Sequence, residues 1–176
     1  MKKKTRTEII LIVMNVLAWI TFIGLMVKAG AILTSFVITL TKPEAAKNLY
    51  SGLNWYNLRQ YDVWYYAGCV TMMAAIAIIQ SYTAFLVIKV LSKIKMTNPF
   101  TMEIAHKLEA ISYLIILSWV AAMIYNGQME WLAKKVEGLN QNLFSPDFIL
   151  IAGMLLVFAQ IFKKGVEIQS ENELTV

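Results

Sequence analysis

The stretch Ile9 to Val27, IILIVMNVLAWITFIGLMV, decides the fold because its 19 residues include no charged side chain. A helix of this length rises about 28 Å, which matches the ~30 Å hydrocarbon core of a bilayer. The run is too long for a cleaved signal peptide, and Val27-Lys28-Ala29 is not a small-x-small cleavage site. We therefore predict an uncleaved transmembrane helix over residues 9–28, with a helical extension over 29–40 that projects from the membrane.

Three more apolar runs follow, at residues 63–90, 108–125 and 148–162. Hydrophobic residues make up 59% of the 176-residue chain and charged residues only 15%, whereas soluble domains average ~25% charged. This balance argues against a soluble globular domain and against a disordered chain. We expect residues 1–176 to form a single all-α transmembrane domain, a four-helix bundle with a polar cytoplasmic tail at 163–176.

The distribution of lysine and arginine predicts the orientation, because positively charged flanks tend to stay in the cytoplasm. If both termini are inside, ten basic residues lie on the cytoplasmic side and five lie outside. The inside set is Lys2, Lys3, Lys4, Arg6, Lys89, Lys93, Lys95, Lys107, Lys163 and Lys164, and the outside set is Lys42, Lys47, Arg59, Lys134 and Lys135. We therefore place both termini in the cytoplasm, with Lys28 near the outer edge of the first span.

Catalytic chemistry is not expected. The chain has no Walker, Rossmann, H-E-x-x-H or G-x-S-x-G pattern, and it has one cysteine, Cys69, and one histidine, His106. Glu103 and His106 have the E-x-x-H spacing of half a di-metal bundle, but the other three spans hold no internal Asp or Glu to complete one. We expect no cofactor, no metal and no direct contact with nucleic acid. We expect the basic residues at 2–6 to set the membrane topology and to contact anionic lipid headgroups.

The loop between the second and third spans has its own helix signals. Pro99 resists continuation of the preceding helix, and Thr101 can cap a new one. Glu103 then falls in the first turn, where a negative charge suits the helix dipole. At the other end of the chain, the tail leaves the membrane through Lys163 and Lys164, turns acidic, and finishes with an apolar tip.

These two segments resemble a known family. The residues that carry the resemblance are Asn98-Pro99-Phe100-Thr101 with Glu103, and the closing Ile161-Phe162-Lys163-Lys164-Gly165, Gln169 and Glu171-Asn172-Glu173-Leu174-Thr175-Val176. They are similar to the bacterial four-span membrane family called domain of unknown function 2975. The resemblance implies a multi-pass protein of the bacterial cytoplasmic membrane without established catalysis, often encoded beside a small helix-turn-helix DNA-binding regulator.

Two candidate surfaces follow. The first would hold a cytoplasmic protein partner, and its residues are Asn98, Pro99, Phe100, Thr101, Glu103, Lys163, Lys164, Glu171, Glu173, Leu174 and Val176. The second is dense in aromatic residues on the outer side, and its residues are Trp55, Tyr56, Arg59, Tyr61 and Trp64. It is either an interfacial aromatic belt or a surface for lipid or another amphiphile.

We expect a regulatory or sensory membrane protein, and the alternative is a structural subunit of a membrane complex or a small oligomeric transporter. Three neutral polar residues within the apolar runs bear on this choice: Asn15, Gln80 and Gln160. They either join helices through hydrogen bonds or line a ligand path. His106 and Glu109 at the membrane boundary either snorkel or form a pH-sensitive pair, and Lys28 either snorkels or marks a buried ion site.

Overall fold

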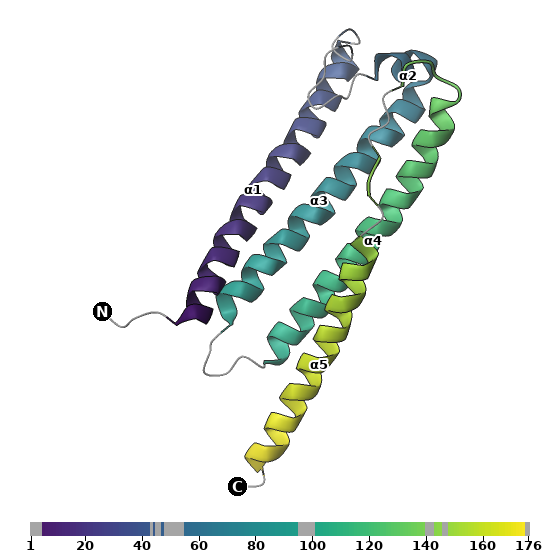
Figure 1. Cartoon of the computed structure of the whole chain (residues 1–176). Coiled ribbons are helices and arrows are strands. Elements are labelled where there is room, and N and C mark those ends of the chain that lie inside the picture. Colours follow the sequence, from purple (N-terminus) through teal and green to yellow (C-terminus); the bar gives the residue numbers. More distant parts are fainter. Residues whose placement is uncertain are drawn as a thin grey trace. The chain divides into compact units, whose positions relative to one another are not determined.

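A computed structural model describes most of the chain as helix (Figure 1). The described residues are 5–42, 44, 47, 55–94, 101–139, 143–145 and 148–174, with no account of the side chains at 148 and 172–174. The helices are α1 (Arg6–Thr41), α2 (Tyr56–Tyr61), α3 (Val63–Lys93), α4 (Met102–Ala133) and α5 (Phe148–Leu174). No strand occurs within these described ranges. The predicted all-α fold class is confirmed.

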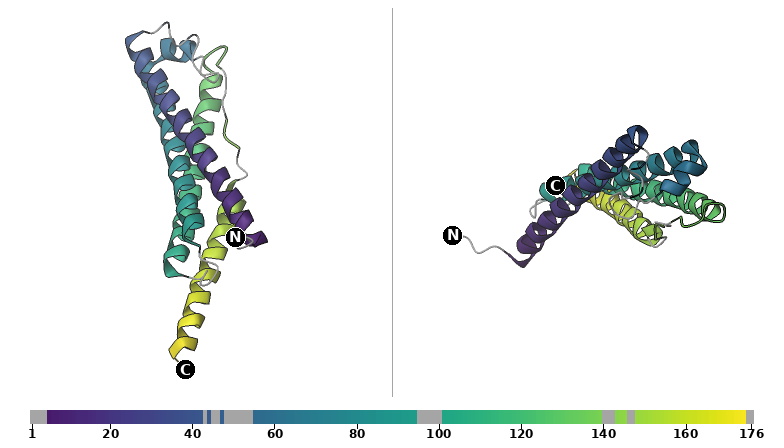
Figure 2. Two further views of the ribbon diagram at one scale, coloured as in Figure 1. Left: turned by 90° about the vertical axis from the view of Figure 1, so that its left-hand side faces the viewer. Right: turned by 90° about the horizontal axis from the view of Figure 1, so that it is seen from above.

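Four of the helices in the described part of the chain are long and apolar enough to cross a membrane. They cover Arg6–Thr41, Val63–Lys93, Met102–Ala133 and Ile149–Glu171. This is the pattern of a multi-pass membrane protein and is compatible with a four-helix membrane bundle. Each helix is longer than the apolar run from which it was predicted. In both views of Figure 2, α1 continues without a break through residues 29–40, as the sequence predicts.

Polar side chains fix the helix starts. Thr5 and Glu8 form a reciprocal capping box at α1: the Thr5 amide donates to Glu8 Oε2 at 2.8 Å, and the Glu8 amide donates to Thr5 Oγ1 at 3.3 Å. Asp62 separates α2 from α3, and its Oδ1 accepts hydrogen bonds from the amides of Trp64 and Tyr65 at 2.6 and 3.1 Å. These bonds satisfy amides that have no partner within the helix.

Contacts divide the chain into two compact units, and α1, α3 and α4 contribute residues to both. The first unit comprises Met1–Ile23, Ser81–Leu117 and Asp147–Val176. Its core consists of buried Leu86 and Val90 from α3 with Ile104 and Ile111 from α4, against which Phe162 of α5 packs. That residues 1–176 form one domain stays a prediction.

The second unit comprises Gly24–Gln80 and Ser118–Pro146 and has the larger core. Its largest fully buried side chains are Trp55, Tyr66 and Tyr125. The Tyr66 hydroxyl forms a buried hydrogen bond of 2.6 Å with Thr39 Oγ1, which joins α3 to the last turn of α1. Cys69 is also fully buried, so α3 presents a packed face rather than an exposed thiol.

Candidate functional site

The described part of the predicted partner surface begins at Thr101, because Asn98, Pro99 and Phe100 lie outside the described residues. The Ile104 amide donates to Thr101 Oγ1 at 3.3 Å, so the prediction that Thr101 caps α4 is confirmed, whereas its contact with a partner stays a prediction. Thr101 is therefore engaged in starting the helix. The helix start in turn fixes the position of Glu103, which lies in the first turn of α4.

Glu103 is held between two lysines. Its carboxylate accepts hydrogen bonds from Lys93 at the end of α3 and from Lys107 in the next turn of α4. These bonds lower the pKa of Glu103 to about 2, the contact with Lys107 contributing most. Glu103 thus ties the two sides of the α3–α4 connection together. Within the residues that the structure describes, no group of three His, Cys, Asp or Glu side chains could hold a metal ion.

Polar side chains also join α4 to α5. Lys163 Nζ donates to Glu109 Oε2 at 2.7 Å, and Gln160 Nε2 donates to Glu109 Oε1 at 3.4 Å. The interhelical bond expected of Gln160 is therefore present, and Glu109 pairs with Lys163. By contrast, Asn15 Oδ1 is buried and finds no hydrogen-bond partner among the described residues.

Residues beyond Phe162, predicted as a polar tail, continue α5 as a helix to Leu174. We call residues 163–174 the α5 extension. Its exposed side chains include Lys164, Glu167, Ile168 and Glu171, which lie at helical positions i, i+3, i+4 and i+7 and so share one face. Nothing is described of the side chains of Glu173 and Leu174, or of Val176.

Two bonds order this exposed face. Lys164 Nζ donates to Glu167 Oε2 at 2.8 Å, and the Ser170 hydroxyl donates to the Glu167 carbonyl at 2.8 Å. The hydrogen bond to Glu167 raises the pKa of Lys164, so the lysine stays charged. Lys164 and Glu171 thus lie on an exposed, charged helical face, and Lys163 is paired with Glu109.

The predicted aromatic surface requires a correction at one residue. Trp55 is fully buried, because it belongs to the hydrophobic core of the second unit rather than to its surface. Tyr56 and Arg59 are partly buried, whereas Tyr61 and Trp64 are exposed, Trp64 at 86%. Only the last two therefore offer a wide face to lipid or a ligand.

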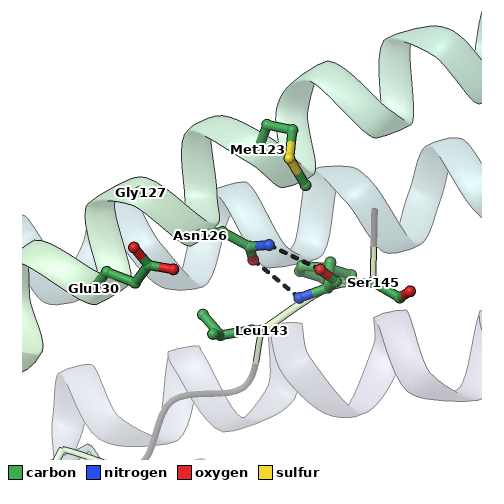
Figure 3. Close-up of a pocket in the computed structure, with 7 residues that line it drawn as sticks. Met123, Asn126, Gly127, Glu130, Leu143 and Ser145 are labelled. Carbon is green, nitrogen blue, oxygen red and sulfur yellow. Dashed lines mark hydrogen bonds between the residues drawn. The ribbon is translucent and has the colours of Figure 1, made fainter. Parts of the chain in front are cut away.

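A pocket in the second unit involves residues that the sequence analysis did not select (Figure 3). One wall is α4, which contributes Met123, Asn126, Gly127 and Glu130, and the other is the segment 143–145. The Asn126 side chain fixes this segment by two hydrogen bonds: Nδ2 donates to the Phe144 carbonyl at 2.8 Å, and the Phe144 amide donates to Oδ1 at 2.9 Å. The sequence feature that could have indicated this site is Asn126, an asparagine directly after the apolar run 108–125.

The Phe144 ring has two further contacts. It lies edge-on to Tyr125, with ring centroids 5.3 Å apart, and Lys28 Nζ is 5.8 Å from its centroid. The second contact is a cation–π interaction, and it brings the charge of Lys28 to the side chain that lines the pocket.

Comparison with protein families gives one match. The model of the family described as "Protein of unknown function (DUF2975)" matches residues 38–176. The chain belongs to the DUF2975 family. No curated protein and no solved structure matches it.

The DUF2975 match covers α2 to α5 and only the last turn of α1. Both the capped start of α4 and the α5 extension, whose residues carried the resemblance, lie within it, and so does the pocket between α4 and residues 143–145. Lys28, which contacts the Phe144 ring, lies outside the matched region.

Proposed function

We propose that this DUF2975 protein is a non-catalytic regulatory or sensory protein of the bacterial cytoplasmic membrane, which holds a cytoplasmic protein partner on its α5 extension and the start of α4. The observation that carries the proposal is that α5 stays helical to Leu174. At 1.5 Å per residue, the 12 residues after Phe162 extend the helix by about 18 Å beyond the apolar run. An anchor for the membrane span would not need such an ordered extension.

The charges of the extension favour a basic partner. Residues 165–176 include Glu167, Glu171 and Glu173 and no lysine or arginine. Acidic side chains beyond the headgroups gain nothing from an anionic membrane surface, which repels them, whereas they complement a positively charged protein. The DNA-binding face of a small helix-turn-helix regulator is such a surface, and binding here would compete with DNA. This regulator is the partner that the family resemblance implies.

The start of α4 offers a second, more rigid contact. Glu103 carries one negative charge between Lys93 and Lys107, so this cluster is net positive by one charge. The extension and the cluster therefore differ in sign, which would orient a partner that has both basic and acidic patches.

The test is affinity purification of the full chain from detergent, with the bound cytoplasmic proteins identified by mass spectrometry. Glu167→Gln with Glu171→Gln should lower recovery of a helix-turn-helix protein, and the interaction should weaken as salt rises, because rim charges are screened within about 10 Å at 0.1 M. Glu137→Gln, at an exposed carboxylate of the second unit, is the matched control.

Deletion of Ser170 to Val176 should abolish the same interaction while leaving membrane insertion intact. If the truncated chain retains every partner of the full chain at all salt concentrations, the partner surface is not on the extension. That result would favour the alternative of a structural subunit or small transporter.

A further inference from the structure

We infer that the pocket between α4 and residues 143–145 binds one phospholipid with an ethanolamine headgroup. This pocket has a volume of about 660 Å³, within the range of sites that hold small molecules. It lies entirely within the second unit, so its walls are defined without reference to the first. The lipid site is separate from the α5 extension and goes beyond the proposed function, so either can fail alone.

The lining changes from apolar to charged along α4. Met123, Asn126 with Gly127, and Glu130 lie at positions i, i+3, i+4 and i+7, so they form one stripe along the helix. Met123 belongs to the apolar part of α4, and Glu130 lies about 10 Å further along the axis, where Gln128, Glu130 and Lys134 replace the apolar residues. An amphiphile bound here would place its chain at Met123 and its headgroup at Glu130.

Opposite α4, the apolar wall is made by Leu143 and Phe144. The backbone of Phe144 is held in place by its two hydrogen bonds with the Asn126 side chain, so the wall is preformed (Figure 3). Gly127 leaves room between the walls, because a Cβ added there would meet nothing within 4 Å. A preformed apolar slot with one charged end suits one of the two acyl chains of a phospholipid together with its polar headgroup.

Two charges select the headgroup. Within the part of the chain that the structure describes, the Glu130 carboxylate forms no ion pair and no hydrogen bond, so it is free to accept an ammonium. Lys28 Nζ lies 5.8 Å from the centroid of the Phe144 ring, and its positive charge would attract the lipid phosphate. An ethanolamine phospholipid carries both groups, with three N–H donors on its ammonium. A glycerol headgroup supplies only the phosphate, and it leaves Glu130 facing a net negative lipid.

The test uses the full chain, purified in detergent and titrated with dioleoyl-phosphatidylethanolamine or dioleoyl-phosphatidylglycerol. Native mass spectrometry counts the lipids that remain bound. We expect one tightly retained phosphatidylethanolamine and about tenfold weaker binding of phosphatidylglycerol, the ratio expected for loss of one charge-assisted hydrogen bond.

Two variants locate the site. Gly127→Leu fills the slot and should abolish retention, whereas Gly153→Leu, at a glycine of α5 whose surroundings are equally open, should retain the lipid. Glu130→Gln should remove the preference for phosphatidylethanolamine, and Glu137→Gln should preserve it. Circular dichroism establishes that each variant is folded.

Equal binding of the two lipids by the wild-type chain would overturn the inference. Retention of phosphatidylethanolamine by a folded Gly127→Leu variant, or an unchanged preference for phosphatidylethanolamine in Glu130→Gln, would also overturn it, because the lipid would then lie elsewhere. Since Glu130→Gln removes no packing, this second variant keeps the test decisive if Gly127→Leu does not fold.

Discussion

Asn126→Ala should release the segment that follows α4. In the wild-type chain, both backbone groups of Phe144 bond to the Asn126 side chain, at 2.8 and 2.9 Å. Each hydrogen bond contributes ~1 kcal/mol net, so their loss lowers the free energy of local opening by about 2 kcal/mol. This corresponds to a roughly thirtyfold rise in the population of the open segment.

Hydrogen exchange at the Phe144 amide measures this change directly, because that amide donates to Asn126 Oδ1. Its exchange rate should rise about thirtyfold in Asn126→Ala, provided that the segment opens and closes faster than exchange occurs. The helical amides of α4 around residue 126 should change little, since their bonds lie within the helix.

Asn57→Ala is the matched control. It removes the same kind of side chain from the same unit, but Asn57 Nδ2 bonds to the Glu137 carbonyl at 2.9 Å and not to Phe144. Exchange at Phe144 should therefore be unchanged in this variant. Equal exchange at Phe144 in wild type and in Asn126→Ala would refute the reasoning, because the segment would then be held by packing alone.

Three further predictions concern the helix ends and the topology. Thr101→Ala should cost about 1 kcal/mol by loss of the cap and should speed hydrogen exchange in the first turn of α4. The pKa of Glu103 is lowered from 4.5 to about 2, so its ion pairs stabilise the fold above pH 4.5 and are lost as the pH falls toward 2. An NMR titration of the Glu103 carboxyl group should show this low midpoint, and a midpoint near 4.5 would refute the prediction. In a Cys69→Ser background, an impermeant thiol reagent should label Glu137→Cys but not Ser170→Cys in intact cells, and the reverse pattern would place both termini outside.

The four spans could be predicted because a run of about 20 apolar residues has few alternatives to a membrane helix. The helix lengths were harder to predict. α4 continues through Asn126 and Glu130 to Ala133, although its apolar run ends near Tyr125. Hydropathy indicates which residues tolerate lipid, whereas a helix requires only that the backbone hydrogen bonds continue along the chain. Polar helical turns beyond a membrane span are therefore not visible in a hydropathy profile.

The aromatic segment around α2 shows a second limit. A tryptophan at a membrane boundary and a tryptophan in a core have the same composition signal, because both bury an apolar ring. Trp55 is buried and Trp64 is 86% exposed, although they are nine positions apart in the same aromatic stretch. The difference is that Trp55 belongs to the buried core of the second unit, and a single sequence does not reveal which rings distant helices will cover.

The pocket could not be predicted for a related reason. Its walls come from α4 and from a loop segment 18 positions beyond Asn126, and no periodic pattern links the two. Glu103 and Lys163 are predicted from the sequence to bind a partner, yet each is already paired, Glu103 with Lys93 and Lys107 and Lys163 with Glu109. A charged side chain needs either a partner of opposite charge or contact with water, and only the fold shows whether the partner lies within the same chain. Glu130 is therefore a stronger candidate for recognition than Lys163, because its side chain is exposed and forms no ion pair among the residues that the structure describes.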